Sequence, residues 1–273
     1  MNVKLQPLLE IAELSKSTYY YVKGTLSQTD KYDYVKISIM EIFNKHKGRY
    51  GYRRITKTLR NDYSIVINHK TVRKLMSVLG ITCRIRVKKY KSYKGTVGKI
   101  APNLLDRDFS TKGVNEKWVT DITEFKICNS KVYLSPLIDL HTKEVISYKI
   151  GSSPNLKLVL DMIIDVINNK DHKELIVHSD QGWHYQHASY RQELKDAGIK
   201  QSMSRKGNCL DNSLAENFFS HLKSEFYYIE SFDSIEEFIS ELHEYIRYYN
   251  NDRISLKIKG MTPVQYRNHS LAA

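Results

Sequence analysis

The chain has 273 residues, of which 41% are hydrophobic, and carries a formal net charge of +13. This length suits two modest domains with globular cores. No apolar run approaches the roughly 20 residues that a membrane helix needs, and the polar start lacks the apolar core of a signal peptide. The composition therefore excludes membrane-spanning classes, and we expect a cytoplasmic protein with no membrane partner.

The cysteines and histidines indicate no metal or disulfide framework. Cys83, Cys128 and Cys209 are odd in number and widely spaced, so they predict neither a disulfide scaffold nor a paired-cysteine zinc site. His184 and His187 lie near each other, but no cysteine pair accompanies them at zinc-finger spacing. We therefore expect reduced thiols and no zinc-binding module.

The positive charge is concentrated in the first part of the chain. Residues 1–110 hold 23 Lys and Arg against 8 Asp and Glu, whereas the remaining residues hold 20 against 22. A strongly basic region indicates an anionic partner such as nucleic acid. The distribution predicts a basic region that binds the anionic partner and a nearly neutral region that carries out the chemistry.

Residues 1–30 predict a short helix followed by a polar connector. Leu5, Leu8, Leu9 and Ala12 recur at helical spacing, and Gly24 with Ser27–Asp30 ends the pattern. This segment either docks on a partner or is an ordinary capping helix, and its residues leave both interpretations open.

Residues 31–90 predict three short helices with apolar stripes. Asn68 is the expected N-cap of the third helix, and Gly80 follows its end. Two helices with basic faces around a turn favour a helix-turn-helix-like DNA-binding domain. For any single residue, a merely solvated charge is the alternative. The candidate DNA contacts on these faces are Arg53, Arg54, Lys57, Lys70, Arg73 and Lys74.

Residues 91–112 are expected to be a linker, which continues a basic stretch that begins at Arg84. Its charge fits a segment that follows a DNA backbone, and a flexible connector explains the same residues.

From residue 113 onward the pattern alternates between strands and helices. Apolar, β-prone runs predict three consecutive antiparallel strands, then an amphipathic helix, a buried strand, a helix, a short strand and two further helices. The expected strands are Lys117–Ile127, Lys131–Leu140, Glu144–Ile150, Leu175–His178 and Lys200–Ser204; the expected helices are Leu156–Ile167, His187–Ala197, one from about Asp211, and Ile235–Tyr249.

Three carboxylates stand in notable positions within this pattern. Asp121 interrupts the first β-rich run, and Asp180 follows the buried strand. Glu216 lies on the helix that begins near Asp211, and Asp211 is the expected N-terminal cap of that helix. At about 100° per residue, Glu216 shares a helix face with Asn212 and Lys223. Converging carboxylates can hold two divalent cations around a phosphodiester. A chain with 30 Asp and Glu residues also contains many unrelated surface triplets.

The sequence context of these carboxylates resembles that of insertion-sequence transposases related to retroviral integrases. The motifs are WVTDIT around Asp121, HSDQG around Asp180 and DNSLAEN around Glu216, with 35 residues between the last two acids. HKGRYGYRRI from residue 46 and YYNNDR from residue 248 also match, so the resemblance covers nearly the whole chain. The chain is similar to OrfB, the second-frame product of the IS-three family of elements.

This resemblance implies an α/β fold, a ribonuclease-H-like integrase core at residues 113–273, preceded by a small all-α helix-turn-helix-like domain. It implies that Asp121, Asp180 and Glu216 are catalytic and ligate Mg²⁺ or Mn²⁺, with two ions when DNA is bound. It also implies a phosphate contact by Arg49 and a DNA contact by Lys223, for which an unrelated exposed lysine is the alternative. The MTPVQY segment from residue 261 matches the family's C-terminal signature without indicating a role beyond packing.

The implied function is metal-dependent cleavage at insertion-sequence ends, followed by strand transfer through attack of a 3′-hydroxyl. The implied partners are double-stranded DNA, both element ends and target, a further copy of the chain, and the first-frame product OrfA as partner or upstream fusion. Three alternatives stay open: a non-catalytic DNA-binding regulator of transposition, a recombinase with a tyrosine nucleophile, and a structure-specific nuclease that joins nothing.

Overall fold

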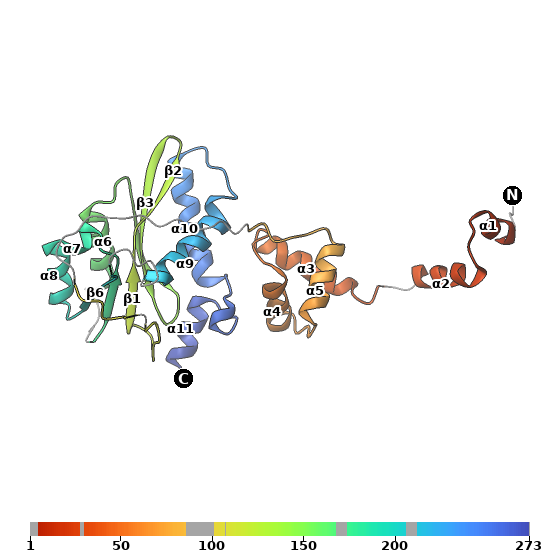
Figure 1. The fold of residues 1–273 in the computed structure, drawn as a ribbon, viewed down its shortest axis with the longest axis horizontal. Coiled ribbons are helices and arrows are strands. Elements are labelled where there is room, and N and C mark those ends of the chain that lie inside the picture. The colour runs from red at the N-terminus through yellow and green to blue at the C-terminus, as the bar shows by residue number, and fades with distance from the viewer. Residues whose placement is uncertain are drawn as a thin grey trace. The chain divides into compact units, whose positions relative to one another are not determined.

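The computed structural model describes residues 5–27, 30–85, 101–106, 108–167, 174–205 and 212–272 (Figure 1). The chain divides into two compact units, Met1–Cys83 and Arg84–Ala273. Half of the expected linker at residues 91–112, and the expected cap Asp211, lie outside the described residues. Cys83 and Cys128 are free thiols, and none of the helices described has the length and apolar character needed to cross a membrane.

The N-terminal segment contains two helices, α1 (Leu5–Ile11) and α2 (Lys16–Ser27). The expectation of a polar connector after the first helix was therefore wrong. The Ser15 hydroxyl accepts a hydrogen bond from the Thr18 N–H at 3.1 Å, which caps the start of α2. Gly24 lies inside α2 rather than ending it, since one glycine in a helix costs only about 1 kcal/mol relative to alanine.

Three helices complete the first unit, as the sequence predicts: α3 (Asp33–Lys45), α4 (Tyr52–Asp62) and α5 (His69–Val78). The Asn68 side chain caps α5 by accepting a hydrogen bond from the Lys70 N–H at 2.8 Å. Gly80 follows α5 at a φ of +67°, a conformation that glycine adopts without strain. The fully buried core side chains that hold the three helices together are Ile39, Ile42, Ile55, Leu59 and Val72.

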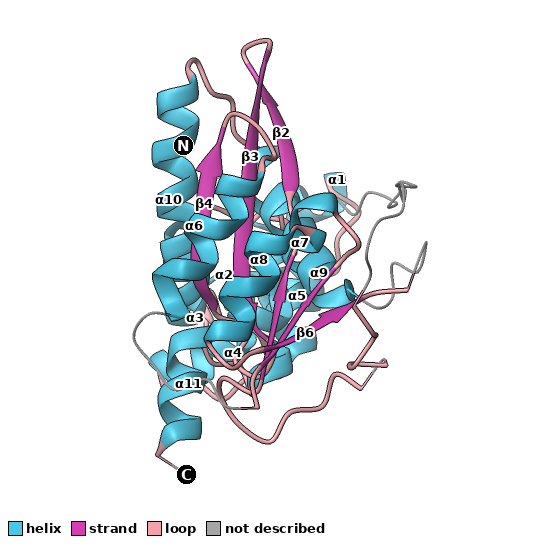
Figure 2. Ribbon diagram, turned by 90° about the vertical axis from the view of Figure 1, so that its left-hand side faces the viewer, coloured by secondary structure: helices cyan, strands magenta, loops and turns pink. Residues whose placement is uncertain are grey.

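The second unit contains one six-stranded sheet (Figure 2). The long strand β3 (Ser130–Asp139) pairs with β4 (Val145–Gly151) on one side. On its other side it pairs with both β1 (Lys117–Thr120) and β2 (Thr123–Ile127). Strand β1 also runs parallel to β5 (Ile176–Ser179), which in turn runs parallel to β6 (Lys200–Met203).

The expected single strand Lys117–Ile127 is interrupted at Asp121 and Ile122. The register is the same on both sides of the break, because Thr120 pairs with Leu137 and Thr123 with Leu134. Asp121 therefore lies opposite Pro136.

Proline explains this interruption. The Leu140 N–H donates to the Lys117 carbonyl at 2.8 Å, and donors toward the same neighbour recur at every second residue of an antiparallel strand. Residue 136 occupies such a position, but proline has no N–H to donate. The ladder therefore loses a hydrogen bond at Asp121, where the strand breaks.

Helices cover both faces of the sheet (Figures 1 and 2). Trp118 and Val177 pack against α6 (Leu156–Ile167), α7 (Trp183–Gln186) and α8 (Ala188–Asp196). Val119 and Phe125 pack on the opposite face against α9 (Ser213–Leu222), the π-helical turn η2 (Lys223–Tyr227) and α10 (Ile235–Asn251). The short helix α7 was not expected from the sequence.

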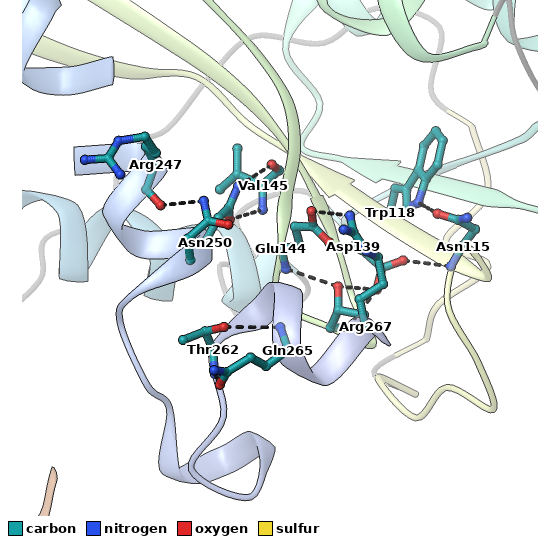
Figure 3. A network of polar contacts seen from close by, with 12 residues as sticks. Asn115, Trp118, Asp139, Glu144, Val145, Arg247, Asn250, Thr262, Gln265 and Arg267 are labelled. Carbon is teal, nitrogen blue, oxygen red and sulfur yellow. Dashed lines mark hydrogen bonds and ion pairs between the residues drawn. The ribbon is translucent and has the colours of Figure 1, made fainter. Parts of the chain in front are cut away.

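The C-terminal segment is tied to the start of β4 by polar contacts (Figure 3). The Asn250 side-chain amide accepts from the Val145 N–H at 3.0 Å and donates to the Val145 carbonyl at 2.9 Å. Arg267, on α11 (Pro263–Leu271), forms an ion pair with Glu144 at 2.5 Å. Thr262 and Gln265 form a capping box that starts α11. Asn250 and Arg267 thus anchor the last two helices to the sheet.

Candidate active site at the ends of β1 and β5

The strand register brings Asp121 and Asp180 next to each other. In the parallel pair β1 and β5, Val119 lies opposite His178. Each aspartate follows its residue by two positions, so the register continued past the strand ends places Asp121 opposite Asp180, and the charge of Asp180 raises the pKa of Asp121. Neighbouring strands are about 4.8 Å apart. Two carboxylates distant in sequence therefore occupy adjacent strand ends.

Helix α9 carries Glu216 close enough to Asp121 for its charge to raise the pKa of that aspartate. Ala215, Phe218 and Leu222 are buried on this helix, whereas Glu216 is only partly buried. At the start of the helix, the Asn212 side chain donates to the carbonyl of Thr120 at 3.3 Å. This contact joins the first turn of α9 to the residue that precedes Asp121.

The electrostatics of Asp121 reflect the neighbouring acids. Burial raises the pKa of Asp121 well above its usual value, and the charges of Asp180 and Glu216 raise it further. The Ile122 N–H, which donates to this carboxylate at 2.8 Å, opposes the shift. Burial also raises the pKa of Asp180, against a hydrogen bond from the Gly182 N–H at 2.9 Å. The three acids thus form a region of concentrated negative potential.

Lys223 belongs to the same region. It begins the π-helical turn after α9, and its Nζ lies 5.6 Å from the centroid of the Phe125 ring. Burial lowers the pKa of Lys223, while the negative charge of Asp121 acts in the opposite direction. Its ammonium group is therefore placed to interact with a carboxylate of the site.

The donor chemistry of the three carboxylates fits a hard divalent cation, because Mg²⁺ and Mn²⁺ prefer carboxylate oxygens and water. Among the residues that the structure describes, no three His, Cys, Asp or Glu side chains are already arranged to hold a metal ion. The structure therefore brings the acids into one region without a closed coordination shell.

Sequence reasoning missed the close packing behind Asp180. A Cβ atom at Gly182 would lie 2.7 Å from the Cε1 and Nε2 atoms of His184 and 3.0 Å from an oxygen of Asp180. Burial lowers the pKa of His184 to about 4, so its ring is uncharged at neutral pH. Only glycine fits between this ring and the carboxylate, and the glycine of the HSDQG motif was the available signal.

Sequence reasoning also missed a buried ion pair between Arg253 and Glu225, which lies in the turn that contains Lys223. Arg253 donates to Glu225 through Nε at 2.7 Å and through Nη2 at 2.6 Å, and the Tyr245 hydroxyl donates to the same carboxylate at 3.2 Å. Arg253 is 3% exposed and Glu225 is 0% exposed. Since Glu225 is in the turn that carries Lys223, Arg253 anchors that turn. The YYNNDR motif contained the signal.

The predicted DNA contacts of the first unit differ in exposure. Arg53, Lys70, Arg73 and Lys74 are exposed, and Arg54 and Lys57 are partly exposed. The guanidinium carbons of Arg53 and Arg73 lie 5.7 and 6.0 Å from the centroid of the Tyr52 ring, so cation–π contacts hold these two arginines near one another. Arg49 is only 5% exposed, and its burial argues for a packing role instead of the expected phosphate contact.

Comparison with known proteins matches both units. Residues 31–89 match the HTH-like domain family, and residues 111–209 and 216–271 match two models of the integrase core domain. A solved structure of the HTLV-2 integrase catalytic core domain in complex with magnesium is similar at a TM-score of 0.48 and 16% identity, covering 58% of this chain and 99% of that one.

Two curated relatives match over most of their lengths. The putative transposase InsK for insertion sequence element IS150 of Escherichia coli is 50% identical over 267 residues, which cover 97% of this chain and 94% of the relative. The transposase InsF for insertion sequence IS3A of Escherichia coli is 33% identical over 238 residues, covering 86% and 82%. This chain therefore belongs to the integrase-core transposases of the IS150/IS3 family of insertion sequences.

Proposed function

We propose that this transposase cleaves a phosphodiester at each end of its insertion sequence and joins the freed 3′-hydroxyl to a second DNA site. The observation that carries the proposal is the register of β1 and β5, which aligns Asp121 with Asp180 when it is continued two residues past the last printed pair. The interaction of Asp121 with the charges of both other acids supports a common role for the three.

In this proposal Asp121, Asp180 and Glu216 hold Mg²⁺ or Mn²⁺, with two ions when DNA is bound. The bound ions supply activation of the attacking oxygen and stabilisation of the leaving oxygen. The carboxylates repel one another and are costly to ionise together, and a bound divalent cation would relieve this repulsion. Lys223 balances part of this charge and contacts a DNA phosphate near the scissile bond.

The exposed basic side chains of α4 and α5 hold the DNA backbone in this proposal. The arginines on Tyr52 are partly preordered by their ring contacts, which reduces the entropy lost when they bind phosphate. A second copy of the chain brings the other element end, and OrfA acts as a partner or an upstream fusion.

The test is a cleavage and joining assay with the full chain, DNA carrying both element ends, and Mg²⁺. We expect Asp180→Asn to lower cleavage by at least about 10³-fold, since each metal ligand contributes several kcal/mol to the transition state. The matched control is Asp161→Asn, which changes an acid on α6 that pairs with Lys157 and is expected to retain activity.

Three outcomes discriminate among the alternatives. Cleavage that survives Asp180→Asn would overturn the carboxylate mechanism. DNA binding without any cleavage, with or without OrfA, would indicate a non-catalytic regulator, and cleavage without joined product would indicate a nuclease. A covalent protein–DNA adduct would instead support a tyrosine nucleophile.

A further inference from the structure

Asn212 is placed unusually for a residue that starts a helix. It precedes α9, and its side chain is only 4% exposed. An asparagine at this position normally accepts a hydrogen bond from a backbone N–H in the first turn. Here the side chain makes no such bond. Its Nδ2 instead donates to the Thr120 carbonyl at the end of β1.

Within the part of the chain that the structure describes, the other half of this amide has no partner. Asn212 Oδ1 is buried and accepts no hydrogen bond from any described residue, an arrangement that destabilises a folded protein because the oxygen has lost its water contacts. Turning the side chain to cap α9 would satisfy this oxygen but release Thr120. The conformation therefore sacrifices stability to keep the helix attached to β1 and to leave one acceptor available.

The position of Asn212 relative to Glu216 and Thr120 indicates which donor its free oxygen would bind. Asn212 is four residues before Glu216, so the two side chains lie one turn apart on the same helix face. Thr120, which the amide contacts, precedes Asp121. A buried acceptor at the start of the Glu216 helix and next to the end of β1 needs a donor as its partner, and the carboxylates themselves provide none when ionised. Water molecules that hydrate a divalent cation are such donors, and Mg²⁺ typically keeps several of them.

We propose that Asn212 is a positioning residue for the cation site. Its Nδ2 fixes the Glu216 helix against the strand of Asp121, and its Oδ1 accepts a hydrogen bond from a water molecule in the hydration shell of the cation. This inference rests on the proposed function, because it requires a cation at the three carboxylates. Partners of this kind orient the ligands of a metal, and their loss lowers metal affinity.

Mn²⁺ binding to the full-length protein without DNA tests the inference, by calorimetry or by the spin resonance signal of the free ion. We expect Asn212→Ala to weaken Mn²⁺ binding by about 10-fold or more, within the range for such supporting residues. The matched control is Asn217→Ala, which changes an exposed asparagine of the same helix. Equal Mn²⁺ affinity in the Asn212→Ala variant and the control would overturn the proposal.

A second variant guards against a folding defect. Serine is as favourable as asparagine at a helix start, so Asn212→Ser should begin α9 normally while lacking the reach of the amide. We expect its melting temperature without metal to match the wild type and its Mn²⁺-induced rise to be smaller. A full Mn²⁺-induced rise in this variant would count against the role of the amide.

Asp180→Asn, measured in parallel, separates this inference from the proposed function. If Asp180→Asn loses Mn²⁺ binding while the Asn212 variants keep it, the inference fails and the carboxylate site stands. If Asp180→Asn retains Mn²⁺ binding, the carboxylate site and the inference fail together.

Discussion

The two units of this transposase organise charge in opposite ways. The helical unit displays basic side chains on its surface, where Arg53, Lys70, Arg73 and Lys74 are exposed. The core gathers a few acids at adjacent strand ends and supports them with buried contacts that leave little room. A distributed surface tolerates the loss of one member, because each phosphate contact adds a modest share of affinity. A site formed by a few carboxylates depends on each buried contact that positions them, since small displacements of the carboxylates lower the reaction rate.

The largest effect on stability is expected from Arg253→Ala. Removing the arginine leaves the buried Glu225 carboxylate without its main partner, which should lower the free energy of unfolding by about 3–5 kcal/mol. Chemical denaturation of the full chain, monitored by fluorescence of the buried Trp118 of the core, measures this change. The exposed pair of Arg247 with Glu244 is the control, and Arg247→Ala should cost less than about 1 kcal/mol. Equal losses of stability in the two variants would contradict the assignment of the Arg253 ion pair as buried and the Arg247 ion pair as exposed.

Gly182→Ala is expected to impair cleavage more than folding. The added methyl group would lie 2.7 Å from the His184 ring and 3.0 Å from Asp180, so one of them must move. A displacement of about 1 Å at a reacting centre can cost about 10²-fold in rate. Single-turnover cleavage at saturating DNA and Mg²⁺ measures this loss. Gly113→Ala is the control, because a Cβ at Gly113 meets nothing within 4 Å; a similar rate loss in both variants would refute the steric explanation.

Asn68→Ala tests the stability of the helical unit. The substitution removes the acceptor for the Lys70 N–H at the start of α5 and should destabilise the unit by about 1 kcal/mol. Amide hydrogen exchange in α5 would report the change locally. Asn68→Ser should restore the protection, since serine supplies an alternative cap; failure of serine to do so would indicate that capping is not the cause.

The smallest single effects are expected on the basic surface. Arg53→Ala or Arg73→Ala should each reduce the slope of log affinity against log salt by about 1. Neither should change the cleavage rate at saturating DNA, because neither belongs to the carboxylate site. DNA titrations at several salt concentrations measure the slope. Lys36→Ala, whose charge is paired with Asp30 at 2.5 Å, is the control and should leave the slope unchanged. A lower cleavage rate at saturating DNA in either arginine variant would contradict the assignment of DNA binding to the helical unit and cleavage to the core.

Residue patterns predicted much of the fold. Apolar stripes located α3, α4 and α5, and Asn68 and Gly80 marked the ends of α5, because caps and periodic burial are local properties. The patterns failed where distant residues decide the backbone. The break at Asp121 depends on Pro136 across the sheet, and the π-helical turn contains a carboxylate bound by Arg253 from a later segment.

The sequence by itself determined the family and most of the order of the elements, and it predicted the three acids, because these depend on residue types in motifs along the chain. Only the tertiary structure decided that Asp121 faces Asp180 through the β1 and β5 register, that Gly182 is confined by a histidine ring, that Arg49 is buried and that Asn212 joins α9 to β1. The physical reason is that register, close packing and buried hydrogen bonds arise between segments far apart in the chain, where no local pattern records them.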